Sequence, residues 1–363
     1  MEFSGLITKY RANRSLTEQE RAQQLKQKQR LNVEPRYQLS VIKINSTFLE
    51  SVDKWFAWKG MISAISLVII GMFVGFFFAL VHVALTRAPG FQGETDDGTM
   101  LVIVGGIMLP LLAACGWLLL KESFAYTHYP MRFNRKTRTV HVFRPNGTVL
   151  SVPWDKLFFT LGHLAQWDEW EVRAHVLAPD EATVQESFAL SYVGSLNAND
   201  LSPARAYSTS EDYVRGHWEF IRRYMEDGPQ AVAGQVQFCM PVSERRESFM
   251  VGVERVFANI AGANFVLYWI LFPVCLVVSL FRFFAMRTSK IPQWPQDIEA
   301  SSAIEDGDPY AMEGDATGER IAIFPESARD AGVAFNVSQE AHEAGDVRPS
   351  AKSARMRSHT VRK

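Results

Sequence analysis

The residues that could carry out acid–base or metal chemistry are few in this 363-residue chain. Asp168, Glu169 and Glu171 are close enough in sequence to act as paired carboxylates in acid–base catalysis. They fall where a predicted loop meets a predicted strand, with no pocket pattern beside them, so we interpret them as a solvated face. Four histidines lack the spacing of metal ligands and are expected to be sheet or surface residues: His141, His163, His175 and His217.

Three cysteines complete the set of reactive candidates. Cys115 and Cys275 lie in apolar segments and Cys239 stands alone, which indicates small buried side chains rather than disulfides. The motifs Gly-x-Ser-x-Gly, P-loop and Cys-x-x-Cys are absent from the sequence. We therefore predict no catalytic residue, no metal and no cofactor, and a protein that is not an enzyme. The formal net charge of −1 also argues against a nucleic acid partner.

A cluster of basic residues is the strongest candidate for a binding site. Its members crowd one predicted β-hairpin directly after an apolar segment: Arg132, Arg135, Lys136, Arg138 and Arg144. Such a cluster could bind anionic lipid head groups or an acidic protein. The alternative, which the sequence favours, is the ordinary positive charge that borders a membrane segment.

Two long apolar segments must position these residues. Residues 61–85 contain no charged side chain, and neither do residues 100–120. A bilayer core needs roughly 20 apolar helical residues, so we predict a transmembrane helical hairpin over 59–121. The preceding residues include eleven basic and six acidic side chains, whereas the loop 86–99 has one basic and three. This asymmetry predicts that the N-terminus and the region after the hairpin are cytoplasmic.

Small residues lie in both predicted spans. Gly71 and Gly75 form a Gly-x-x-x-Gly pattern, which lets two helix backbones approach closely. The pattern could form a homodimer interface. The favoured alternative is packing against the second span, where Gly105, Gly106 and Gly116 offer similar small surfaces. His82, an ionisable residue within a span, lies near its outer end and is expected to reach the interface uncharged.

The remaining regions have different expected organisations. Residues 1–58 are predicted to be a polar cytoplasmic leader with a solvated helix that begins at the capping box Thr17–Glu20 and runs to Arg30. Residues 122–247 should form a small curved antiparallel sheet or partial barrel, closed by an amphipathic helix over 208–227. The expected strands are 131–134, 139–144, 148–153, 170–177 and 186–192. Residues 291–363 are predicted to be a mostly disordered tail.

A third apolar segment, residues 256–286, has two possible topologies. As one straight helix it is longer than the bilayer core, and Pro273 lies inside it. It could cross the membrane with tilt, or bend and fold back. Because Arg282, Arg287 and Lys290 follow its uncharged part, residues 256–281, the positive-inside rule slightly favours a bent or re-entrant segment with a cytoplasmic tail.

Two stretches of sequence carry a family resemblance. Residues 131–144, with Gly147-Thr-Val and Val152-Pro-Trp-Asp155, resemble the first strands of bacterial PH-like domains on membrane anchors. The stretch from Met286 to Pro295 resembles an uncharacterised proteobacterial inner-membrane protein family with the same layout, often encoded near type VI secretion effector genes. The resemblance implies an α+β membrane protein with a PH-like cytoplasmic domain, and it carries over no active-site residue.

The resemblance and the residues together lead to three functional hypotheses. The first is a non-enzymatic inner-membrane protein that presents its PH-like module to a protein partner, as an accessory or immunity protein of type VI secretion. The second is a scaffold that binds anionic membrane lipids through the basic hairpin. The third is a toxin that acts on membranes. Each hypothesis makes membrane lipids a partner of the chain.

Overall fold

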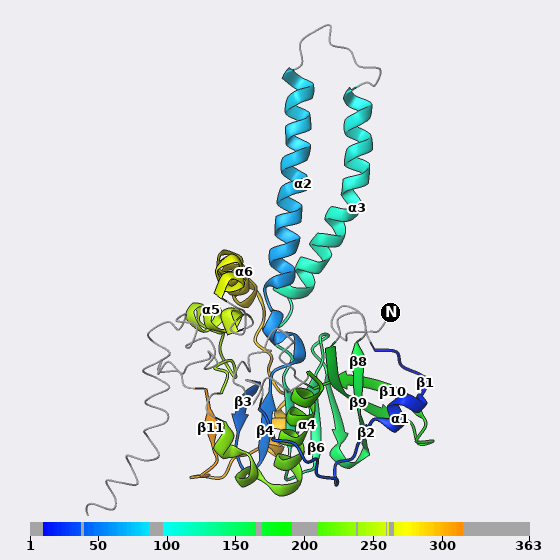
Figure 1. Ribbon diagram of the computed structural model, residues 1–363, viewed down its shortest axis with the longest axis vertical. Coiled ribbons are helices and arrows are strands. Elements are labelled where there is room, and N and C mark those ends of the chain that lie inside the picture. The colour runs from blue at the N-terminus through cyan, green and yellow to red at the C-terminus, as the bar shows by residue number, and fades with distance from the viewer. Residues whose placement is uncertain are drawn as a thin grey trace, which may run out of the picture.

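The fold is a mixed α+β arrangement with two antiparallel sheets and three long apolar helices, which confirms the predicted fold class at this level. A computed structural model describes residues 10–37, 40–86, 97–164, 169–190, 210–236, 239–258, 260 and 265–314. Its sheets and one amphipathic helix form a body, from which two long helices project side by side (Figure 1).

The first sheet has six strands in the order β11-β3-β4-β5-β6-β7. Short alternating strands with turn residues between them account for its central meander, including the turn at Asn146-Gly147. The strand bounds are β3 (Val41–Ile44), β4 (Phe48–Ser51), β5 (Met131–Asn134), β6 (Thr139–Phe143), β7 (Val149–Pro153) and β11 (Met312–Glu313).

The second sheet has five strands in the order β1-β10-β9-β8-β2. Its strand bounds are β1 (Arg14–Ser15), β2 (Gln24–Leu25), β8 (Leu157–Leu164), β9 (Glu169–Leu177) and β10 (Thr183–Ala189). Strand β8 was not predicted, because its sequence Leu-Phe-Phe-Thr-Leu-Gly-His-Leu is buried nearly throughout and lacks the alternation typical of a half-exposed strand.

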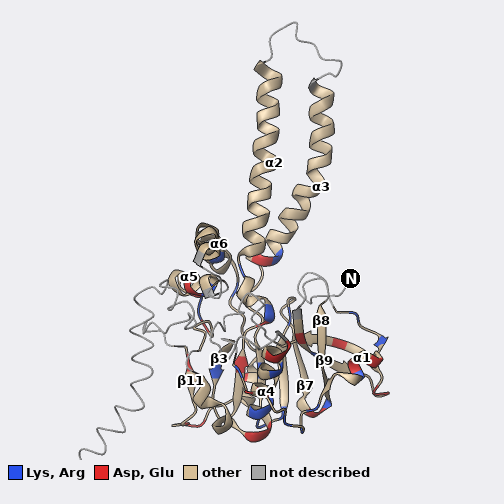
Figure 2. Ribbon diagram, in the orientation of Figure 1, with Lys and Arg blue, Asp and Glu red and all other residues tan. Residues whose placement is uncertain are grey.

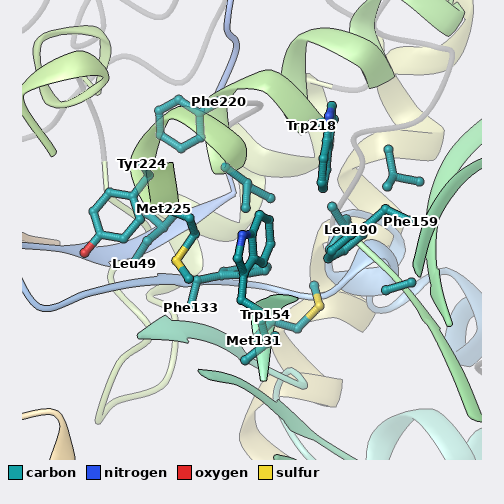
Figure 3. Packing of buried hydrophobic residues seen from close by; sticks show 14 of the residues in the cluster. Leu49, Met131, Phe133, Trp154, Phe159, Leu190, Trp218, Phe220, Tyr224 and Met225 are labelled. Carbon is teal, nitrogen blue, oxygen red and sulfur yellow. The ribbon is translucent and has the colours of Figure 1, made fainter. Parts of the chain in front are cut away.

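Helix α4 (Ser210–Asp227) closes the core between the sheets. Trp218 of this helix stacks on Trp154 with ring centroids 5.6 Å apart, and Phe159 lies 4.6 Å from Trp218 (Figure 3). All three side chains are fully buried. Large aromatic side chains of this kind dominate the burial of apolar surface in a core, so this cluster fixes α4 on the sheets.

Four further helices join the body to the membrane region. They are α2 (Met61–Thr86), α3 (Asp97–Ser123), α5 (Phe249–Ala258) and α6 (Phe265–Thr288). Three of them, α2, α3 and α6, are long and apolar enough to cross a membrane, which indicates a membrane protein. The remaining short helices are α1 (Glu18–Ala22), η1 (Lys54–Trp58), η2 (Trp154–Lys156), η4 (Pro229–Ala231), η5 (Ala233–Gln235) and α7 (Gln296–Ser301).

The hairpin α2–α3 is inserted between two neighbouring strands of one sheet. Strand β4 precedes α2 and strand β5 follows α3, and the two pair antiparallel with Phe48 opposite Asn134 and Ser51 opposite Met131. The points where the hairpin leaves and re-enters the body are therefore next to each other. This pairing returns the chain to the side from which it left.

The leader is organised differently from the prediction. Its capping box forms as expected, with Thr17 accepting from the Glu20 N–H, but helix α1 ends at Ala22 instead of continuing to Arg30. Residues 41–44 and 48–51 are two buried strands of the six-stranded sheet. The body therefore includes residues from before the hairpin, in addition to the predicted domain over 122–247.

The ordered structure extends further toward the C-terminus than predicted, since disorder was expected past about residue 300. Ile298 of α7 is buried, and the Asp308 carboxylate accepts from the Ser46 N–H at 2.6 Å. Strand β11 pairs with β3. Residues 315–363, with the basic end of the predicted tail, lie outside the described residues.

The third apolar segment forms two helices. The short helix α5 and the long helix α6 pack against each other through Phe257, Tyr268 and Phe272. Pro273 lies within α6 rather than at the break between the helices. The predicted single segment over 256–286 is therefore divided near residues 259–264, which lie outside the described residues with the exception of Ile260.

Candidate functional site

Charged and polar side chains gather where the hairpin meets the body. Helices α2 and α3 are free of charge along most of their length, with acidic and basic residues at their base (Figure 2). The start of α2, the end of α3 and the end of α6 meet here. Helix ends leave backbone N–H and C=O groups without helical partners, so each must find one in this junction.

Glu122, at the end of α3, satisfies the start of α2. One of its carboxylate oxygens accepts from the Gly60 N–H at 2.9 Å, and the other accepts from the Ser63 N–H at 2.5 Å. The side chain is buried. A carboxylate at a helix N-terminus also interacts favourably with the helix dipole. The last turn of one span therefore caps the first turn of the other.

Lys59 makes the opposite connection. Its Nζ donates to the Glu122 carbonyl at 2.6 Å and to the Tyr126 carbonyl at 2.7 Å, at the C-terminal end of α3. Burial lowers the pKa of the Lys59 ammonium to about 8, although Glu122 and Asp53 favour its charged form. Lys59 and Glu122 together form a reciprocal cap. Lys59, just before α2, bonds carbonyls at and just after the end of α3, and Glu122, in the last turn of α3, bonds N–H groups at the start of α2.

Arg282 attaches α6 to the same junction. Its guanidinium is fully buried and donates to both carboxylate oxygens of Glu247, at 2.7 and 2.8 Å. It also donates to the Phe56 carbonyl at 2.8 Å. Arg246 then donates to the carbonyls of Met286 and Ser289 at the end of α6, both at 3.1 Å. The ends of η1 and α6 are thus satisfied by arginine side chains.

A small pocket lies beside the reciprocal cap. Asp53 forms part of its wall and accepts from the Tyr129 N–H at 2.8 Å and the Trp55 N–H at 3.0 Å. Burial raises the pKa of Asp53, while burial and the charge of Lys59 lower the pKa of His128 to about 3. The pocket is lined by Asp53, Trp55, Phe56, Lys59, Ile62, Leu118, Lys121, Glu122, Thr127, His128 and Tyr129.

The chemistry of this junction is that of helix capping. The carboxylates of Asp53 and Glu122 are occupied by backbone N–H groups, and the amine of Lys59 is occupied by carbonyls. Across the described part of the chain, no group of three or more His, Cys, Asp or Glu side chains could hold a metal ion. The arrangement can therefore fix the orientation of the hairpin on the body.

The five basic residues predicted as a lipid site each bond to the protein itself. Arg132 is buried; its Nε donates to Glu50 at 2.8 Å and its Nη2 donates to Glu299 at 2.9 Å. Burial raises the pKa of Glu50 although Arg132 acts in the opposite direction. Lys136 pairs with Glu305 at 2.5 Å, and Arg135 donates to the Ser46 carbonyl at 3.3 Å.

The other two members are also paired, Arg138 in the same turn as Arg135 and Lys136, and Arg144 directly after β6. Arg138 donates to Asp155 at 2.6 and 2.7 Å and to Glu226 at 2.7 Å. Arg144 bonds both carboxylate oxygens of Glu186. The structure does not bring the five residues together as a free positive surface. The acidic residues of the C-terminal segment, Glu299 and Glu305, supply part of the pairing.

The carboxylates and histidines considered first occupy structural positions. For Glu171 the expected solvated face is wrong: its side chain is fully buried and accepts from Lys54 at 2.5 Å and from Arg173 at 2.6 Å. Two histidines bond to serine across strand pairs, His141 to Ser151 at 2.8 Å and His175 to Ser187 at 2.7 Å. His217 is buried on α4, and His163 lies in β8. Asp168 and the side chain of Glu169 lie outside the described residues.

His175 also completes an arrangement that the sequence did not indicate. Its Nε2 lies 3.2 Å from a carboxylate oxygen of Glu20 and its Nδ1 bonds Ser187, so the three side chains form a line of successive contacts. Burial alone would raise the pKa of Glu20, but the contact with His175 and hydrogen bonds from Arg14 and Thr17 hold it below its usual range. His175 is fully buried. The line resembles a catalytic triad in residue types, and its burial fits a link between leader and sheet.

Of the five glycines in the two spans, only Gly105 packs against the opposite helix, and the expected packing of Gly71 and Gly75 on α3 is wrong. A Cβ atom at Gly71, Gly75 or Gly106 would have no neighbour within 4 Å, and at Gly105 it would meet the Phe77 ring at 3.6 Å. Gly116 is likewise open. The Gly71–Gly75 surface therefore faces away from α3 and is available to another helix. His82 is exposed on α2.

Comparison with known proteins gives one family. Residues 109–306 match the model of a family of unknown function, DUF6708. No curated protein and no solved structure matches the chain. The matched region runs from the second half of α3 through β5–β10, α4, α5 and α6 to α7, and so contains Glu122, Glu247 and Arg282 of the junction. Since it covers more than half of the sequence, the chain belongs to the DUF6708 family of unknown function.

Proposed function

We propose that this protein is a non-enzymatic, membrane-anchored binding module that presents a PH-like body to a protein partner at the cytoplasmic face of a bacterial inner membrane. One observation carries the proposal: the hairpin is inserted between paired strands β4 and β5 and capped at its base by Lys59 and Glu122. Such a base holds the body in one orientation on the membrane. A fixed orientation suits a docking platform better than a tethered enzyme.

The order of the elements supports the PH-like assignment. Strands β4 to β7 form a four-stranded meander, strands β8 to β10 form a three-stranded meander, and α4 follows them. Antiparallel strands closed by a C-terminal amphipathic helix are the arrangement expected for residues 122–247, and they fit a PH-like domain. The membrane hairpin occupies the connection between β4 and β5.

The distribution of exposed apolar side chains limits where a partner can bind. In the described ranges, large exposed apolar residues lie on α2, α3, α5 and α6, with Phe124 beside them. Ile304 is the exception on the body. Extended apolar patches commonly mark interfaces. A partner of the body therefore forms a mainly polar contact, or it binds through the free edges of the sheets.

Replacing the spans tests whether the body is the binding module. Residues 65–86 and 97–118 would be exchanged for an unrelated hairpin of equal length, leaving Lys59, Ser63 and Glu122 in place. Native-membrane purification should then recover the same stoichiometric partner with the natural and the exchanged hairpin. Recovery only with the natural spans would locate binding in the membrane. Recovery of no partner with either chain would contradict the proposal.

The resemblance to a family encoded near type VI secretion effectors supports an accessory or immunity role. Expression of the chain alone should leave growth unchanged, and co-expression with the neighbouring effector should protect the cell. Growth arrest by the chain alone would instead favour the toxin hypothesis.

The lipid-scaffold hypothesis requires Arg135, Lys136 and Arg138 to exchange their present partners for phosphate. Their replacement by Ser would then abolish thermal stabilisation of the full chain by phosphatidylglycerol in nanodiscs.

A further inference from the structure

Helix α6 has one packed face and one uncovered apolar face. The packed face contains Tyr268, Cys275, Val278 and Arg282, all less than 10% exposed. On the opposite face, Ile270, Val274 and Leu280 are 62%, 52% and 59% exposed. An apolar surface of this length is costly in water, because the hydrophobic effect acts against its exposure. Something outside the described residues must cover it.

Both ends of the α5–α6 pair are bound to the body. Ahead of α5, the Met240 N–H donates to the Val41 carbonyl of β3 at 2.7 Å, and Glu247 then pairs with Arg282 of α6. At the end, the Lys290 N–H donates to the Ala125 carbonyl at 2.9 Å, and the Thr127 N–H donates to the Lys290 carbonyl at 2.8 Å. A helix that crosses a membrane delivers its two ends to opposite sides. Here the chain leaves and rejoins the body at one side.

Along the length of α2, helix α6 contacts only the first turns. The shared apolar cluster includes Met61 and Ala64 of α2, whereas Val68 and Met72 further along are 50% and 69% exposed. A third span running beside α2 would cover those later turns. Figure 1 shows α6 almost end-on while α2 and α3 run along the length of the molecule, so α6 lies across the base of the hairpin.

We propose that α6 is an interfacial helix that lies in the membrane leaflet facing the body, and that among the described helices only α2 and α3 cross the bilayer. The partner of the uncovered face is this lipid leaflet. The apolar residues Ile270, Val274 and Leu280 then lie among the acyl chains, while Arg282 remains in the protein. Helices of this kind bury one apolar side at the boundary of head groups and acyl chains.

The charges around α6 fit the same position. Lys121, Arg287 and Lys290 are exposed at the level where α3 and α6 end. Lys121 lies over the Trp117 ring at 5.5 Å, and Arg287 lies over the Phe283 ring at 5.0 Å. None of the three cations forms an ion pair with a described residue. Basic and aromatic side chains at one depth are typical of the head-group region, where phosphates are the available anions.

The depth of spin labels tests the proposal directly. The full-length protein would be reconstituted in vesicles of phosphatidylethanolamine and phosphatidylglycerol, with one Cys at position 266, 270, 274 or 280. The three native cysteines are buried, so labelling of the folded protein is directed to the new site. We expect one uniform shallow depth for the four α6 positions. Labels at exposed positions 65, 72, 78 and 85 of α2 provide the control, with a depth that rises and then falls.

A depth gradient along α6 matching that of α2 would overturn the proposal. A second measurement uses a membrane-impermeant maleimide on Ser15→Cys and Asp306→Cys, which lie before α2 and after α6 and are both exposed. In vesicles that hold the protein in one orientation, both positions should be labelled from the same side of the membrane. Labelling of the two positions from opposite sides would show a third crossing. These outcomes are independent of partner capture by the body, so the proposed function can fail while this inference stands, and the reverse.

Discussion

At the scale of single residues, the reciprocal cap carries most of the consequences. Burying a lysine and a glutamate costs free energy unless hydrogen bonds satisfy them. Here Glu122 accepts two backbone N–H groups and Lys59 donates to two carbonyls. Each side chain also has the charge that the adjacent helix end attracts. Lys59 and Glu122 therefore stabilise both helices through bonds to backbone groups at the helix ends, which a direct Lys–Glu ion pair would not do.

Removing the charge of Glu122 should weaken this junction. In Glu122→Gln the amide group would place a donor against the N–H of Gly60 or Ser63, so one buried donor loses its acceptor. We expect a loss of about 2 kcal/mol in the free energy of unfolding. Thermal unfolding of the detergent-solubilised chain, followed by near-ultraviolet circular dichroism, would show it. Glu18→Gln, at an exposed position of α1, is the control. Equal melting temperatures for both variants would contradict the capping role.

Buried neutral histidines make stability depend on pH. Burial lowers the pKa of His217 to about 4, although its hydrogen bond to the Arg36 carbonyl acts in the opposite direction. His217 binds a proton near pH 6.5 in the unfolded chain and only near pH 4 in the folded chain. The free energy of unfolding therefore decreases as the pH falls between these values. The expected contribution of His217 is about 2 kcal/mol between pH 7 and pH 5.

The variant His217→Asn should reduce this pH dependence by the same amount. Unfolding free energies measured at pH 7 and pH 5 would give the difference for wild type and variant. Trp218→Phe lowers stability at a neighbouring position without removing a titrating group, so its pH dependence should equal that of the wild type. An unchanged pH dependence in His217→Asn would show that His217 does not titrate as expected. His141 and His128 contribute in the same direction, with pKa values lowered to about 4 and about 3.

At the scale of elements, the joint between η1 and α2 depends on Gly60. Its φ angle is +96°, which favours glycine, and a Cβ atom would collide with the Arg282 backbone of α6. We expect Gly60→Ala to lower the free energy of unfolding by about 3 kcal/mol, through both backbone strain and the displaced helix. Gly71→Ala, in the open part of α2, should be neutral or slightly stabilising. Thermal unfolding of both variants would test this contrast.

Elements with a local signal were predictable from the sequence. Uncharged length identified α2 and α3, and alternation with an Asn-Gly turn identified β5, β6 and β7. Strands β3 and β4 were missed, because each has four residues and β4 finds its partner β5 only beyond the hairpin. The leader helix was predicted too long, since Leu25 is buried in strand β2 rather than exposed on a helix.

The candidate site could not be predicted from local patterns. Lys59, Glu122, Glu247 and Arg282 are distant in sequence, and most of their partners are backbone groups at or near helix ends. A weak signal did exist. Lys59 comes two residues before α2, Glu122 follows the second apolar block, and Arg282 follows the third. Such boundary charges fit an ordinary membrane interface equally well, and only the folded chain distinguishes the two.

At the scale of the whole molecule, the open glycines of α2 bear on self-association. Gly71 and Gly75 have no neighbour within 4 Å in one copy of the chain, which leaves the predicted homodimer surface uncovered. If two copies associate there, Gly71→Ile with Gly75→Ile should reduce energy transfer between labelled copies in vesicles by severalfold. Gly116→Ile, at another open position, is the control. Equal energy transfer in all variants would exclude a dimer through this face.

The division of the chain into domains also appears only at this scale. The body draws strands from before the hairpin, between the hairpin and α5, and after α6. Sequence composition suggested a separate leader and tail, because both are polar. Polar residues such as Glu299 and Asp308 instead bond to the body, to Arg132 and Ser46.

The insertion of α2–α3 between β4 and β5 has a consequence for biosynthesis. The ribosome makes β4 before either span and β5 after both, and among the described strands it makes β11, the neighbour of β3, last. While the hairpin is entering the bilayer, the first strands have no hydrogen-bonding neighbour on one edge. The six-stranded sheet can close only after insertion is complete. A nascent chain that fails to insert would keep those edges open, and an open edge is a recognised target for chaperones and proteases.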